Sequence, residues 1–115
     1  MNNRDRMKLF VEEKCAQWFG EEIGFRPQAG IRFKTKIYAS SPIMEGFGIA
    51  IESVEPQAPI AQYQAENGLL FFVEEQDAWF FQDYDLEVHL DSHFKEPVYT
   101  YLKEGQVIAS GGSSC

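Results

Sequence analysis

Three residues in the second half of the sequence alternate in a pattern that could bind a metal ion. His89, Asp91 and His93 lie two residues apart, and Glu87 precedes them at the same interval. Alternate residues of a strand point to the same face, so these side chains would lie together. Imidazole and carboxylate groups are ligands of zinc and iron. A solvated sheet face shows the same alternation, and a turn is expected over 92–96. A mononuclear site at His89, Asp91 and His93 is therefore one open hypothesis.

A polar loop between two expected strands is the second candidate for binding. It runs from Tyr38 to Gly46 and contains Ser40, Ser41 and Glu45. Loops on a rigid sheet are where binding groups gather. No histidine stands nearby in the sequence to activate a serine hydroxyl, which disfavours nucleophilic catalysis. We predict a binding loop here and no catalytic residues, with an ordinary strand connection as the alternative.

The two cysteines lie near opposite ends of the sequence, and no CxxC or CxC pair is present. A tetrahedral thiolate site within one chain is therefore excluded. Cys15 falls on the apolar face of an expected helix and is predicted to be a buried, small apolar residue. Cys115 is expected to be exposed, and a symmetric homo-oligomer could bring its thiols together to hold iron or an iron–sulfur cluster.

The spacing of apolar residues predicts the elements that carry these groups. A strand is expected over 7–11 and a helix over 12–23, in which Cys15, Trp18 and Phe19 share one face. Asn67-Gly68 predicts a hairpin with a type I′ turn. Further strands are expected at 31–38, 46–54, 63–65, 69–73, 83–90 and 97–102, with a short helix at 74–81. The predicted fold is mainly β: a small two-sheet sandwich or pseudo-barrel with one N-terminal helix and one short helix.

Length and composition indicate one domain. The chain has 115 residues, of which 44% are hydrophobic and 15% aromatic, enough to fill one core. The domain is expected over 1–104, followed by a flexible tail over 105–115 that is rich in glycine and serine. No apolar stretch approaches the roughly 20 residues of a membrane helix. The start of the sequence lacks the apolar run of a secretory signal. We therefore predict a cytoplasmic protein that does not bind membranes.

The charge balance is acidic, with 18 acidic and 10 basic residues and a formal net charge of −8. Such a surface repels phosphate backbones, so nucleic-acid binding is disfavoured and an unidentified protein partner is expected. The acidic series Glu74, Glu75, Asp77, Asp83 and Asp85 lacks the glycine of a calcium loop. These residues are predicted to form a solvated helix surface.

Three stretches of the sequence resemble one known family. MKLFVEEKCAQWFGEE resembles the opening strand and helix of the HesB-like (A-type) domains of iron–sulfur cluster biogenesis. AGIRFKTKIYASSPIMEGFGIAI looks like the two central strands around the family's first cysteine loop. NGLLFFVEEQDAWFFQDYDLEVHL is similar to a later hairpin strand, short helix and strand. The resemblance covers residues 7–102 and implies a HesB-like fold.

The resemblance does not extend to the cysteines of the family. Cluster-carrying members have one cysteine in the loop after the first long strand and a CxC pair near the C-terminus. This sequence has Ser40 and Ser41 in that loop and no CxC pair. A neutral hydroxyl is a poor iron ligand beside a thiolate. The chain therefore resembles a cysteine-poor bacterial branch.

A HesB-like scaffold without these cysteines implies a non-enzymatic accessory or binding domain, linked to iron–sulfur cluster biogenesis by the resemblance and needing no cofactor. Two alternatives stay open. One is an iron or iron–sulfur carrier that uses Cys115 thiols shared between chains. The other is the mononuclear metal site at His89, Asp91 and His93.

Overall fold

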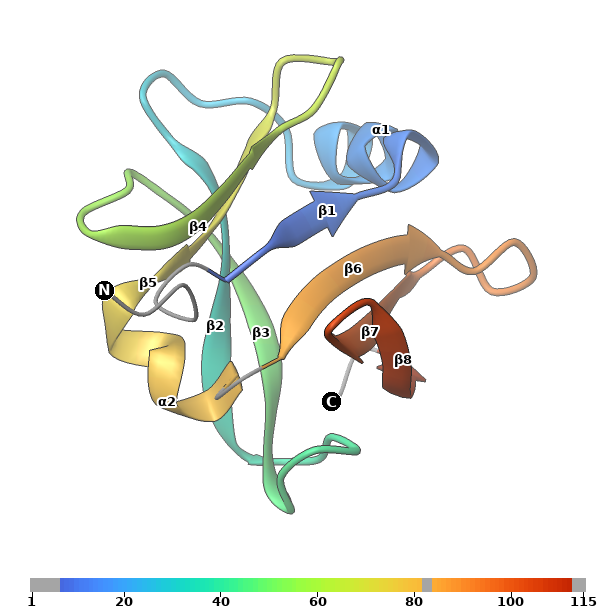
Figure 1. Ribbon diagram of the computed structural model, residues 1–115. Helices are drawn as coiled ribbons and strands as arrows, with labels where there is room; N and C mark the ends of the chain where they lie inside the picture. Colours follow the sequence, from blue (N-terminus) through green and yellow to red (C-terminus); the bar gives the residue numbers. More distant parts are fainter. Residues whose placement is uncertain (1–6, 82–83, 113–115) are drawn as a thin grey trace.

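Two four-stranded sheets face each other in the computed structural model, which describes residues 7–81 and 84–112 (Figure 1). Along the chain, the elements are β1 (Leu9–Val11), α1 (Glu13–Glu22), β2 (Gly30–Ala39), β3 (Gly46–Val54), β4 (Pro59–Gln64), β5 (Leu70–Glu74), η2 (Glu75–Asp77), α2 (Ala78–Phe81), β6 (Asp85–Leu90), β7 (Pro97–Lys103) and β8 (Gln106–Gly112). Within the described ranges no helix is long and apolar enough to cross a membrane.

The sheets are mixed and do not close into a barrel. One has the strand order β1-β6-β7-β8 and the other β3-β2-β5-β4. The β1–β6 and β2–β5 pairs are parallel, and the remaining neighbours are antiparallel. This arrangement confirms the predicted mainly β, two-sheet fold with one N-terminal helix and one short helix.

The long β2–β3 hairpin follows the alternation in the sequence. Ile31 and Phe33 of β2 are buried, whereas Arg32 and Lys34 alternate with them on the other face. Strand β3 occupies the predicted range 46–54. Because apolar residues at every second position all point to one face, burying that face fixes the register of the strand.

An aromatic cluster between the sheets forms the centre of the core. Phe33 and Phe71 stack with ring centroids 5.8 Å apart. Phe19 of α1 contacts both rings, and Tyr99 of the opposite sheet contacts Phe33. Helix α1 thereby packs the side chains of Cys15, Ala16 and Phe19 into the core, as its apolar face predicts.

The β4–β5 hairpin is confirmed, but its predicted type I′ turn is wrong. Gly68 has a positive φ of 96° and Asn67 does not, whereas a type I′ turn needs both. The N–H of Gly68 donates to the carbonyl of Ala65 (3.0 Å). The Asn67 side chain instead donates to the carbonyl of Ala16 (3.0 Å) and ties the hairpin to α1. Strand β4 also begins earlier than predicted, at Pro59.

Most of the segment 105–115, which the sequence predicts to be a flexible tail, is a strand in the structure. Residues Gln106–Gly112 form β8, which pairs with β7 in antiparallel register. The turn before it consists of Glu104 and Gly105, which both have positive φ values (53° and 84°), as a two-residue type I′ turn requires. Glycine and serine suggest mobility by composition, but the turn and the strand pairing hold this segment in place.

Candidate functional site

The binding loop predicted at Tyr38–Gly46 begins at a bulge in β2. The β2–β3 register shifts between Ile37 and Ala39, so Tyr38 is the extra residue. Tyr38 has a positive φ of 58°, and its side chain is 93% exposed. An aromatic residue rarely adopts this backbone conformation, and such strain is typical of functional positions. The bulge therefore places a highly exposed aromatic side chain on a strained backbone.

The rest of the loop is held by its own hydrogen bonds. The Ser41 hydroxyl donates to the carbonyl of Met44 (3.1 Å) and accepts from the N–H of Met44 (3.2 Å). Pro42 lies so close to Gly111 of β8 that a side chain at Gly111 would meet it at 3.2 Å. Ser40 and Glu45 are exposed. Ser41 therefore shapes the loop, whereas Ser40 and Glu45 are free to meet a partner.

Three further apolar side chains lie near this end of the β2–β3 hairpin. Ile37 is paired with Phe47 across the hairpin, so both point to the same face. Trp79 of α2 packs against Phe47 with ring centroids 5.3 Å apart, and half of Trp79 is exposed. In Figure 1, α2 lies beside this end of β2 and β3. We call Ile37, Tyr38, Phe47 and Trp79 the Tyr38 surface.

The structure does not bring His89, Asp91 and His93 together. The His89 ring nitrogen Nε2 lies 3.0 Å from Glu87 Oε1, at the end of β6. The Asp91 carboxylate accepts from the backbone N–H groups of His93 (3.2 Å) and Phe94 (3.4 Å), so it caps the turn that follows. No three His, Cys, Asp or Glu side chains within 7–81 and 84–112 could hold a metal ion together. This geometry gives no support to the predicted mononuclear site.

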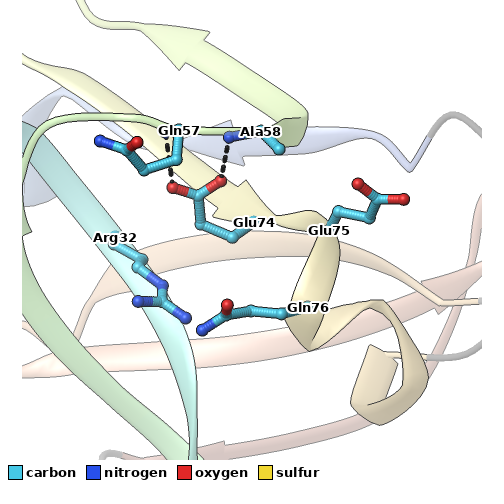
Figure 2. A pocket seen from close by; sticks show the side chains of 6 residues that line it. All are labelled: Arg32, Gln57, Ala58, Glu74, Glu75 and Gln76. Atoms are coloured by element: carbon cyan, nitrogen blue, oxygen red, sulfur yellow. Dashed lines mark hydrogen bonds between the residues drawn. The ribbon is translucent and has the colours of Figure 1, made fainter.

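A cavity of about 260 Å³ lies where β2 and β5 separate (Figure 2), lined by Arg32, Gln57, Ala58, Glu74, Glu75 and Gln76. Both Glu74 carboxylate oxygens accept backbone N–H bonds, from Gln57 (2.8 Å) and Ala58 (2.7 Å). The Arg32 guanidinium is engaged by Asp77 (2.8 Å). The main charged groups around the cavity therefore hold the protein together.

The same contacts correct the prediction of a solvated acidic helix. Glu74, Asp77 and Asp85 are all buried. Asp85 accepts from the backbone N–H of Lys8 (2.9 Å), and Asp77 pairs with Arg32. Buried carboxylates need such partners, and these partners lie far away in the sequence. Glu75 is exposed as predicted, and Asp83 lies outside the described residues.

Comparison with known proteins identifies the family of this chain. No family model matches it. It is 30% identical over 95 residues to a Bacillus subtilis protein named Pyruvate dehydrogenase inhibitor, an alignment that spans 83% of this chain and 99% of the relative. The chain belongs to the family of this Bacillus protein. It is also 27% identical over 100 residues to an uncharacterised Staphylococcus haemolyticus protein, covering 84% of this chain and all of that one.

A solved structure confirms the HesB-like fold that the sequence predicted. It is that of Escherichia coli SufA, described as involved in the biosynthesis of iron–sulfur clusters, with a TM-score of 0.55. The two chains are 21% identical, and the match covers 90% of this chain and 95% of SufA. The likeness to SufA thus concerns the fold, and the sequence relationship is to the Bacillus protein.

Cys15 is poorly suited to bind a metal on this HesB-like scaffold. Its side chain is fully buried and free. Burial, with a smaller contribution from the negative charge of Glu12, raises the pKa of the Cys15 thiol to about 12. The thiolate is the form that binds metal, and a thiol with so high a pKa stays protonated near neutral pH. Cys15 therefore serves as a buried residue of the core. Cys115 lies outside the described residues, so the hypothesis of shared Cys115 thiols stays a prediction.

Burial also predicts that Cys15 does not react in the native protein. In a Cys115→Ser variant, Ellman's reagent at pH 8 should find no reactive thiol in the folded state and one after denaturation. The variant leaves Cys15 as the sole cysteine, so the signal is unambiguous. Rapid labelling of the folded variant would contradict the buried, protonated state of Cys15.

Proposed function

We propose that this chain is a non-enzymatic protein that binds a protein partner through the Tyr38 surface. The observation that carries the proposal is Tyr38 itself, an exposed aromatic side chain on a strained, bulged backbone. Aromatic side chains dominate the binding energy of protein interfaces. An exposed aromatic side chain at a strained backbone position supports a binding role for this surface.

We further propose that the partner is a pyruvate dehydrogenase. The support is the name of the Bacillus relative, with which this chain aligns over 99% of that protein's length. A protein without a catalytic site inhibits an enzyme by occupying one of its surfaces. The net charge of −8 would steer the chain toward a basic region of such a surface. The proposal includes a cytoplasmic location, where a free thiol such as that of Cys15 stays reduced.

Replacing Tyr38 by glycine separates binding from folding. Glycine adopts a positive φ without strain, so the free energy of unfolding should be unchanged or rise by up to about 1 kcal/mol. Loss of an aromatic anchor should weaken binding by about 30-fold or more. Affinity is measured by biolayer interferometry against a purified pyruvate dehydrogenase complex from the source organism. Inhibition is measured as the rate of pyruvate oxidation.

Tyr38→Gly both relieves backbone strain and removes an aromatic ring, and one control variant matches each effect. Lys95→Gly relieves a positive φ elsewhere (57°), and Phe94→Ala removes another exposed aromatic ring, outside the Tyr38 surface. Both should bind as the wild type does. If Tyr38→Gly and Phe94→Ala weaken binding equally, the Tyr38 surface is the wrong site. If the wild type does not bind the complex at all, the proposed partner is wrong.

The alternative function, an iron–sulfur carrier, can be tested on the purified protein. Protein prepared without oxygen should be colourless and free of iron and sulfide if the binding proposal holds. Near-stoichiometric iron and sulfide with visible absorption would instead favour the carrier. Loss of that colour in a chain truncated after Ser114 would then assign the thiol to Cys115.

A further inference from the structure

Strand β8 lies at the edge of its sheet, and its outer side is open to pairing. Within the described residues, β8 pairs with β7 on one side and with no strand on the other. In an antiparallel pair, an edge strand turns the N–H and C=O groups of alternate residues away from its neighbour. Gln106–Gly112 thus presents a row of backbone groups that another strand could pair with.

The other three edges carry the features by which proteins block such pairing. Strand β1 has only three residues. Strand β3 carries Glu52, which pairs with Arg32 and Lys34. Strand β4 begins with Pro59, which has no N–H to donate. Charges, proline and short length all discourage edge-to-edge pairing. Strand β8 has seven residues with neither charge nor proline, and its pairing with β7 is irregular at one residue, Ile108.

The side chains of β8 favour a partner of low charge. Val107 is 63% exposed and Ile108 is 50% exposed. Two copies of a chain with a net charge of −8 repel each other over most of their surface. An uncharged strand is where two copies can approach with the least repulsion. A strand that pairs antiparallel with its own copy also needs no other complementary sequence.

We propose that β8 pairs antiparallel with β8 of a second copy of this chain. A two-fold axis near Ala109 then joins two β1-β6-β7-β8 sheets into one continuous eight-stranded sheet. Such an interface uses the same surface of both copies, as two-fold dimers do. One strand pair buries less than the roughly 1,200 Å² of a stable interface. The dimer therefore forms and dissociates with protein concentration.

Analytical ultracentrifugation of the full chain over about a hundredfold range of concentration tests this dimer. The wild type should shift from monomer to dimer across the range. Ile108→Lys places a charge at the edge and should leave the protein monomeric throughout. Val107→Lys should do the same, and circular dichroism confirms that each variant is folded. Phe25→Lys, which adds the same charge at an exposed aromatic residue outside β8, should still form dimers.

Amide hydrogen exchange tests the pairing itself. In the concentrated wild type, the outward-facing N–H groups of alternate residues in 106–112 should gain protection that dilution or Ile108→Lys removes. A wild type that stays monomeric overturns the proposal. So does a dimer that survives both lysine substitutions in β8, or one that forms without added protection there. These outcomes are independent of binding at the Tyr38 surface, which Tyr38→Gly reports separately.

Discussion

Replacing Phe33 by alanine should lower the free energy of unfolding by about 3–5 kcal/mol, the usual loss when a buried phenylalanine becomes alanine. The Phe33 ring is fully buried. It stacks on Phe71, with an interplanar angle of 8°, and its edges meet Phe19 and Tyr99. These rings come from both sheets and from α1. The substitution therefore opens a cavity at the point where three elements join, which a rigid sheet cannot close.

Urea-induced unfolding followed by tryptophan fluorescence measures this loss. Ile37→Ala is the matched control, because Ile37 occupies the same face of the same strand but is 59% exposed. Its loss should stay below about 1 kcal/mol, as for exposed substitutions in general. Equal losses in the two variants would contradict a core centred on the Phe33 ring.

Much of the fold could be predicted from the sequence because its core strands have one buried face. Alternation in β2 and β3, and the change to helical spacing in α1, are local patterns that the final structure keeps. Strand β8 was missed because glycine and serine dominate its end. The signal lies at its start, where Glu104-Gly105 forms a type I′ turn and Gln106-Val107-Ile108 begins the strand.

The site was predictable only in part, because its decisive features are conformational or long-range. The sequence indicates a polar loop at 38–46, but not that Tyr38 adopts a positive φ. The contact of Trp79 with Phe47 joins residues far apart in the chain. Asp77 looked like a surface acid because Arg32, its partner, is 45 positions away. Local patterns show which side chains are buried, but not which buried charges meet.

Asp77→Ala should lower the free energy of unfolding by about 3–5 kcal/mol, the usual loss when one partner of a buried ion pair is removed. Asp77 Oδ2 accepts from Nη2 (2.8 Å) and Nε (3.3 Å) of Arg32, and Oδ1 accepts from the N–H of Thr35 (3.1 Å). The side chains of Arg32 and Asp77 are only 13% and 7% exposed. Alanine would leave a guanidinium and an amide without these acceptors. Glu52, at 3.4 Å and partly exposed, replaces them poorly.

A double-mutant cycle measures how far the pair is coupled. Arg32→Met with Asp77→Leu removes both charges and should be closer to wild-type stability than either single change. Glu75→Ala, an exposed acid on the same turn, should change stability by less than about 0.5 kcal/mol. Additive losses in the cycle would mean that Asp77 acts through Thr35 alone.

The same pair connects stability to the Tyr38 surface. Asp77 comes directly before α2, and its bonds to Arg32 and Thr35 fix the start of that helix on β2. Trp79 follows two residues later and packs on Phe47. Asp77→Ala should therefore weaken partner binding as well as folding, whereas Phe33→Ala should affect binding only in proportion to the unfolded fraction. Binding measured well below the unfolding midpoint, where both variants are folded, separates the two effects.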